Sequence, residues 1–206
     1  MLISHSYKYI YTRHQKTGST TLLDVLPEYY MYLNQSKTRE AWQDEVKQKT
    51  KIDYDPHHIP LYELNKLKNI NKSNYFKFSF TRNPWDRMVS LYFYSIKYRE
   101  LTSDVSFKQF ISDLNGYAKR NATKWIGAFM NSVDFNKGFD FIGKCETMQK
   151  DFDYVCEKIN APKKKLPFLN KTNHKKYTEY YDDKTKQIVA DRYAKDIEYF
   201  GYKFGE

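Results

Sequence analysis

Apolar and polar positions alternate in two stretches of the chain, and each stretch leads into a helical pattern. Residues 7–11 and residues 75–80 are rich in aromatic side chains and are typical of strands. A polar turn and then residues 20–26, which favour a helix, follow the first strand. Pro84 follows the second strand and prevents its continuation, because proline cannot donate to a strand ladder. Residues 85–98 then carry apolar side chains at helical spacing. Two strand–loop–helix units are therefore predicted.

The rest of the chain continues this alternation. A third strand is predicted at residues 139–143, with a helix after it at residues 148–159. Further helices are expected at residues 38–48, 106–114, 122–130 and 184–199, the last with Val189, Tyr193, Ile197 and Phe200 on one face. This order predicts one α/β domain over residues 1–206, a three-layer, P-loop-like sandwich with a central, mainly parallel sheet flanked by helices. Ligands of such folds bind at the carboxyl ends of the strands.

The composition of the chain predicts a packed hydrophobic core and a positively charged protein. Hydrophobic residues make up 40% and aromatic residues 18% of the 206 positions, enough for a packed interior. The formal net charge of +10 favours polyanionic partners such as nucleotides, nucleic acid or acidic polysaccharide, although many lysines only solvate a surface. The two cysteines, Cys145 and Cys156, lack the spacing of a zinc site or a disulfide framework, so buried free thiols are expected. Since neither a membrane-spanning run nor a signal peptide is visible, we expect a soluble, cytoplasmic protein.

The turn after the first predicted strand reads Lys16-Thr17-Gly18-Ser19-Thr20-Thr21. At such a position the amides of a helix start, and the positive end of its dipole, attract an anion. Gly18 allows a close backbone approach or a positive φ, and Lys16 adds a full charge. An ordinary capped turn fits the same residues, so the pattern alone leaves both interpretations open. A Walker loop is not formed, because Lys16 precedes Gly18.

Two segments together resemble the sulfotransferases that use 3'-phosphoadenosine-5'-phosphosulfate (PAPS). The Lys16-to-Thr21 loop is similar to the family's Lys-x-Gly-[Ser/Thr]-[Ser/Thr] loop, although Gln15 stands where membrane-anchored carbohydrate sulfotransferases often have proline. The second segment, with the family's Arg-x-Pro, Arg and Ser-x-Tyr pattern, is Arg82-Asn83-Pro84-Trp85-Asp86-Arg87-Met88-Val89-Ser90-Leu91-Tyr92. Residues 139–146, 166–172 and 196–202 also resemble family segments, so the similarity covers nearly the whole chain. The pattern is most similar to the carbohydrate sulfotransferases, including the chondroitin and heparan 2-O types.

The resemblance implies a function and a set of donor-binding residues. The expected reaction moves a sulfuryl group from PAPS to a hydroxyl acceptor, with a carbohydrate as the favoured acceptor and no metal. Such transfer depends on positioning and electrostatics, as phosphoryl transfer does. Lys16 would stabilise the leaving group, and Arg82 and Ser90 would hold the 3'-phosphate, which suits a guanidinium fork. The residues implied at the 5'-phosphosulfate are Lys16, Thr17, Gly18, Ser19, Thr20 and Thr21.

The acceptor hydroxyl also needs a base, and histidine titrates in the right range. In the 2-O-sulfotransferase-like members a histidine lies before the second strand. Here His58 stands at that place, with His57 beside it as the second candidate, although an ordinary surface turn fits both. His14, beside the phosphate loop, and His174, in a basic loop, are alternative candidates for ligand contact.

Two other classes of function fit parts of the sequence. A P-loop-type small-molecule kinase, or another mononucleotide-binding transferase, would need a Walker lysine and acidic magnesium ligands, and neither is evident. A basic nucleic-acid-binding module would need a recognisable motif, and neither RNP-like aromatics nor a helix-turn-helix pattern is present. The expected partners are therefore a nucleotide donor and a hydroxyl acceptor, without nucleic acid or membrane.

Overall fold

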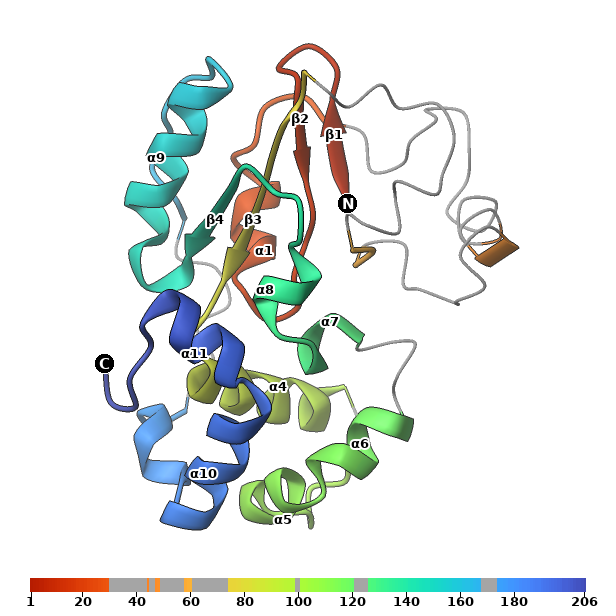
Figure 1. Ribbon diagram of the computed structural model, residues 1–206, viewed down its shortest axis with the longest axis vertical. Helices are drawn as coiled ribbons and strands as arrows, with labels where there is room; N and C mark the ends of the chain where they lie inside the picture. Colours follow the sequence, from red (N-terminus) through yellow and green to blue (C-terminus); the bar gives the residue numbers. More distant parts are fainter. Residues whose placement is uncertain are drawn as a thin grey trace.

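The centre of the fold is a four-stranded sheet in the order β1 (Leu2–Ser4), β2 (Tyr9–Tyr11), β3 (Phe76–Thr81) and β4 (Phe141–Lys144). The computed structural model describes residues 1–29, 44, 47–48, 58–60, 74–98, 101–120, 126–167 and 174–206. Strands β2, β3 and β4 are parallel, and β1 pairs antiparallel with β2 at the edge (Figure 1). Helices flank this sheet, so the predicted α/β architecture with a mainly parallel sheet is confirmed.

The edge strand β1 is not predicted from the sequence. Leu2 pairs with Tyr11 and Ser4 pairs with Tyr9, across a turn in which Lys8 has a φ of 51°. All three residues of β1 are buried. A strand of this length with both faces covered shows no alternation of apolar and polar positions, so periodicity does not reveal it.

One face of the sheet packs against α1 (Ser19–Leu23) and α9 (Met148–Lys158). Aromatic side chains from β2 and β3 form the sheet side of this core, and the helices contribute mainly aliphatic ones. The burial of these rings supplies much of the apolar stabilisation of the sheet. The cluster contains Leu2, Tyr9, Tyr11, Leu22, Val25, Leu26, Phe78, Phe80, Phe152, Val155, Cys156 and Ile159.

A second core is formed by helices that lie beyond the carboxyl end of β3 (Figure 1). Its elements are α4 (Pro84–Lys97), α5 (Phe107–Ser112), α6 (Leu114–Arg120), α7 (Ile126–Phe129), α10 (Asp183–Arg192) and α11 (Ala194–Phe200). The remaining short elements are α8 (Ser132–Phe135), η1 (Cys145–Thr147) and η2 (Tyr177–Tyr180). Among the described helices, none has both the length and the apolar character needed to cross a membrane.

Helix α4 begins directly after β3, as the proline predicts. The Asn83 side chain accepts hydrogen bonds from the backbone amides of Trp85 and Asp86, at 3.1 and 3.5 Å, and Pro84 occupies the first turn. Both features are typical of helix starts, because they satisfy or remove amides that lack an intrahelical partner. The strand-to-helix junction is thus specified locally.

Two of the predicted helices are interrupted in the structure. The helix expected at 184–199 is divided at Tyr193 into α10 and α11. The Asn131 side chain donates to the carbonyl of Arg192 at 3.1 Å and accepts from the amide of Asp196 at 3.2 Å, so it satisfies backbone groups on both sides of the break. The helix expected at 106–114 likewise ends at Ser112, and α6 starts at Leu114.

The other predicted helices either correspond to helices of the structure or lie partly outside the described residues. The helix at 148–159 corresponds to α9, and the one at 20–26 to α1, which ends earlier than predicted, at Leu23. Of the helix expected at 122–130, the described part is α7. Most of the helix expected at 38–48 lies outside the described residues.

Candidate active site

The two predicted donor loops lie side by side at the carboxyl edge of the sheet. One loop follows β2 and the other follows β3, and these strands pair in parallel with Tyr11 opposite Phe78. The loops touch, because Nη1 of Arg82 donates to the carbonyl oxygen of Lys16 at 3.4 Å, although the two residues are 66 positions apart. The fold therefore brings together the two segments on which the family resemblance rests.

The first loop turns through two residues in the left-handed region. Lys16 has a φ of 63° and Gly18 a φ of 72°. Glycine adopts this conformation without a steric penalty, whereas Lys16 brings a Cβ into it. A Cβ built on Gly18 would clash with Cε of Met148, so the loop also packs closely on α9. Helix α1 starts directly after this turn, where the Thr21 amide donates to the Gly18 carbonyl at 3.1 Å.

The hydroxyl residues of this loop differ in exposure. Thr17 is fully buried, and its hydroxyl donates to the His14 carbonyl at 2.7 Å. The Thr17 hydroxyl is therefore used inside the loop. Ser19 and Thr21 are each 8% exposed, and Thr20 is exposed.

Gln15, the departure from the carbohydrate-sulfotransferase pattern, has a structural partner. Its side chain is 2% exposed, and Oε1 accepts from the backbone amide of Ala128 at 2.7 Å. This bond connects the first loop to α7, a contact that a proline at the same position would lack.

Arg82 lies at the start of the second loop, and its guanidinium group is positively charged. Its Nε and Nη2 both donate to Oδ2 of Asp86 at 2.8 Å, and 22% of its side chain is exposed. Burial by itself lowers the pKa of the guanidinium, but the nearby acidic groups, Asp86 first among them, outweigh this and raise it. Arg82 is thus held in place and still reachable from solvent. Ser90 lies two turns into α4 and is 6% exposed.

Glu146 supports the second loop from the end of the third parallel strand. Its Oε1 accepts from the Asn83 amide at 2.6 Å, and its Oε2 accepts from the Tyr202 hydroxyl at 3.4 Å. Residues 139–146 resemble a family segment, but the sequence does not reveal the contact of Glu146 with Asn83. Glu146 fixes the backbone that presents Arg82.

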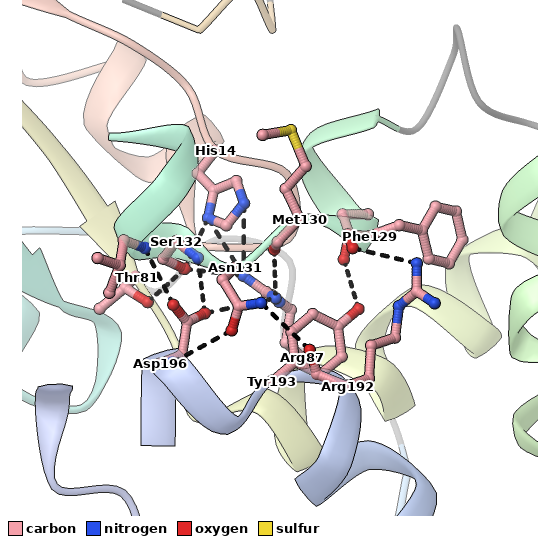
Figure 2. A network of polar contacts seen from close by, with 12 residues as sticks. His14, Thr81, Arg87, Phe129, Met130, Asn131, Ser132, Arg192, Tyr193 and Asp196 are labelled. Atoms are coloured by element: carbon pink, nitrogen blue, oxygen red, sulfur yellow. Dashed lines mark hydrogen bonds and ion pairs between the residues drawn. The ribbon is translucent and has the colours of Figure 1, made fainter. Parts of the chain in front are cut away.

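A buried polar network lies beneath both loops and is centred on Arg87 (Figure 2). Nη1 of Arg87 donates to the Ser132 hydroxyl at 2.9 Å and lies 3.2 Å from Nδ1 of His14. The Ser132 hydroxyl also accepts from Thr81 at 2.8 Å, so its own proton points to Nδ1 of His14, 3.1 Å away. Nδ1 of His14 is therefore an acceptor, and His14 anchors the loop internally.

Asp196 supplies the negative charge of this network. Its carboxylate accepts from the amides of Ser132 and Val133, at 2.7 and 3.0 Å, and Oδ2 lies 3.8 Å from Nη2 of Arg87. Asp196 and Arg87 are both fully buried, and Arg87 also lies 4.6 Å from the ring centroid of Tyr193. Helix α11 is thereby connected to α4, α8 and the first loop. The sequence marks the segment of Asp196 as family-like but does not predict this pair.

His58 contacts the first loop directly. Its Nδ1 lies 2.7 Å from the carbonyl oxygen of Arg13, 45 positions away. A carbonyl can only accept, so Nδ1 carries a proton, and in the neutral ring Nε2 is the unprotonated nitrogen. In this tautomer Nε2 is the nitrogen that can accept a proton. His57 lies outside the described residues.

The remaining histidines lie elsewhere. His174 is half-buried and stacks on Phe93 at a ring-centroid distance of 5.2 Å. His5 lies on the β1–β2 turn and contacts the Tyr75 hydroxyl at 2.6 Å. Both thiols are free, as predicted, and Cys156 is buried, but Cys145 is only half-buried, so the predicted burial is wrong for that residue.

Residues 1–203 match the family model of the sulfotransferase family. The chain belongs to this family. Its fold is similar to the crystal structure of a sulfotransferase from Alicyclobacillus acidocaldarius, with a TM-score of 0.50, 12% identity and 96% of each chain covered. An uncharacterized protein from Archaeoglobus fulgidus is 31% identical over 88 residues, which are 43% of this sulfotransferase and 70% of that protein. Family and fold together support sulfuryl transfer as the general activity.

Proposed function

We propose that this sulfotransferase moves the sulfuryl group of PAPS to a hydroxyl of a carbohydrate acceptor. The observation that carries the proposal is the contact between the two donor loops, in which Arg82 reaches the carbonyl of Lys16 at 3.4 Å. A nucleotide with phosphate groups at both its 3' and 5' positions matches two cationic loops that already touch. ATP lacks the 3'-phosphate and has no comparable partner for Arg82.

Each donor-binding residue contributes a distinct interaction. Arg82 and Ser90 bind the 3'-phosphate, as a guanidinium fork and a hydroxyl donor. The first loop binds the 5'-phosphosulfate through the amides of Gly18, Ser19 and Thr20 at the start of α1, and Lys16 adds its charge.

His58 takes the proton from the acceptor hydroxyl at Nε2. The acceptor oxygen forms a bond to sulfur while the bond from sulfur to the phosphate oxygen breaks, and the leaving phosphate gains negative charge. Lys16 stabilises that charge. His57 is the second candidate for the base.

A carbohydrate acceptor agrees with the charge of the chain as well as with the family resemblance. The formal net charge is +10, which attracts an acidic polysaccharide before any specific contact forms. An anionic saccharide with a free hydroxyl is therefore the first acceptor class to screen.

Calorimetric titration with 3'-phosphoadenosine-5'-phosphate (PAP), the desulfated product, tests the donor. We expect PAP to bind the wild-type protein with a dissociation constant in the micromolar range and ATP to bind at least about tenfold more weakly. Arg82→Ala should weaken PAP binding about 10- to 100-fold, because it removes charge-assisted hydrogen bonds to phosphate.

Arg120→Ala is the matched control. Arg120 also pairs with an aspartate, Asp113 at 2.6 Å, but it is 62% exposed and lies on α6. It should leave PAP affinity unchanged. Equal affinity for ATP and PAP, or equal effects of the two arginine substitutions, would contradict the proposed donor.

A further inference from the structure

The ammonium group of Lys16 lies on the face of an aromatic ring outside both family motifs. Nζ of Lys16 is 3.9 Å from the ring centroid of Tyr94, well inside the range of a cation–π interaction. Both side chains are half-buried, which weakens competition from water. Tyr94 is in α4, so the contact joins the first loop to the helix that follows the second loop.

The backbone of Lys16 is already fixed. Its φ of 63° places it in the left-handed region, and its carbonyl accepts from Arg82 at 3.4 Å. The position of the ammonium group then depends on the torsions of the lysine side chain, which are soft and lose rotamer freedom when the group is held. A ring under Nζ restricts those torsions before any ligand binds.

Tyr94 is itself held in place. Its ring packs against Tyr98 at a centroid distance of 4.3 Å with an interplanar angle of 36°, and both residues are on α4 or its C-cap. Ser90 lies one helical turn earlier than Tyr94, so the two side chains share a face of the helix. Helix α4 therefore carries both the Ser90 hydroxyl and the ring that contacts Lys16.

We infer that Tyr94 is a positioning residue for sulfuryl transfer, acting through Lys16. The inference rests on the proposed function, in which Lys16 stabilises the leaving phosphate. The ring face holds the ammonium group where charge develops, so less reorganisation is needed during the reaction. The role depends on the ring and not on the phenol hydroxyl, so phenylalanine should replace Tyr94 and an aliphatic side chain should not.

Steady-state kinetics of Tyr94→Phe, Tyr94→Leu and Tyr94→Met test this role, with thermal melting to show that each variant is folded. Tyr94→Leu and Tyr94→Met should lower kcat about 5- to 30-fold, because they remove a cation–π contact that is partly shielded from water. KM for PAPS and the affinity for PAP should stay within about twofold of wild type. Tyr94→Phe should stay within about twofold in all three quantities.

A double-mutant cycle tests whether Tyr94 acts through Lys16. Once Lys16→Met has removed the ammonium group, adding Tyr94→Leu should lower kcat no further, because contacting residues are coupled. A purely structural effect of Tyr94 would instead multiply with that of Lys16→Met and overturn the inference. Equal losses in Tyr94→Phe and Tyr94→Leu would also overturn it.

An NMR measurement reports the contact without any donor. The side-chain protons next to Nζ of Lys16 should be shifted upfield by the ring in the wild type and in Tyr94→Phe, and not in Tyr94→Leu. If the wild type is active and Tyr94→Leu has the same kcat, the inference about Tyr94 is wrong while the proposed function still stands. A wild type that neither binds PAP nor transfers sulfuryl groups would defeat the proposed function, and the catalytic role of Tyr94 with it.

Discussion

At the residue scale, the hydrogen bond to the Arg13 carbonyl fixes the tautomer of the neutral His58 ring. Its Nδ1 lies 2.7 Å from the carbonyl oxygen of Arg13, which can only accept, so the proton of the neutral ring is on Nδ1. The same bond places the ring beside the loop that carries Lys16. His14, three positions before Thr17, is closer to that loop in sequence, but it is fully buried and bonded to Ser132. Proximity in sequence alone therefore does not identify the base.

His58→Asn separates base chemistry from loop structure. The asparagine amide can still donate to the Arg13 carbonyl, but it cannot take up a proton. We expect kcat to fall about 10²- to 10⁴-fold, the usual contribution of a positioned base, with PAP affinity within about twofold. His5→Asn, on the β1–β2 turn, is the control and should leave kcat unchanged. A His58→Asn variant with wild-type kcat would exclude His58 and turn attention to His57.

At the element scale, α11 is joined to α4 and α8 by one buried carboxylate. Asp196 accepts from both first amides of α8 and pairs with Arg87, with neither side chain exposed. A charge in such a position is tolerated only when it is paired and hydrogen-bonded. The surface offers a direct comparison, since Asp134 of α8 pairs with Lys195 of α11 at 2.8 Å where the two side chains are 44% and 63% exposed.

Replacing each aspartate by alanine should give very different losses of stability. Asp196→Ala leaves the Arg87 guanidinium buried without its anion and should lower the free energy of unfolding by about 3–5 kcal/mol. Asp134→Ala removes an exposed pair and should cost at most about 1 kcal/mol. Urea denaturation measures both. Similar losses for the two variants would show that the Arg87–Asp196 pair does not stabilise the fold as the geometry implies.

Local signals explain which elements could be predicted from the sequence. The start of α4 is encoded in Asn83 and Pro84 themselves, so the predicted helix and the α4 of the structure nearly coincide. The break at Tyr193 depends on Asn131, 61 positions from the Arg192 carbonyl that its side chain contacts. No local pattern contains that information.

The candidate site shows the same division. Both donor loops were predicted from motifs, because the chemistry of each is contained in a few consecutive residues. The contacts that hold the loops are long-range: His14 with Ser132 is 118 positions apart, and Asn83 with Glu146 is 63. The place of His58 came from the family resemblance, since nothing local connects it with Arg13.

At the scale of the whole molecule, the candidate site lies where two hydrophobic cores meet. The first loop starts in the sheet core with β2, and α4 belongs to the helical core. Tyrosines are unusually prominent in both, and three of them, Tyr9, Tyr11 and Tyr193, are fully buried. Burial raises the pKa of each of these phenols above its ordinary value.

These buried groups make the protein sensitive to alkali. Burial also raises the pKa of the Cys156 thiol to about 11, from about 8.5 in an unfolded chain. A group with a raised pKa keeps its proton longer in the native state than in the unfolded state. Its contribution to stability is therefore complete below the unfolded pKa and is lost as pH rises above it. The contribution of the thiol to stability therefore starts to be lost above about pH 8.5, and that of the phenols above about pH 10.

We expect the free energy of unfolding to be steady near pH 7–8 and to fall increasingly above about pH 9, by about 1.4 kcal/mol per pH unit for each group that stays protonated only in the native state. Urea denaturation across this range measures the fall, and tyrosinate absorbance of the native protein should lag behind that of the unfolded chain. Loss of lysine charge over the same range reduces self-repulsion from the net charge of +10 and acts in the opposite direction. A free energy of unfolding that stays constant or rises up to about pH 10.5 would therefore show that charge relief, and not the buried phenols and thiol, controls alkaline stability.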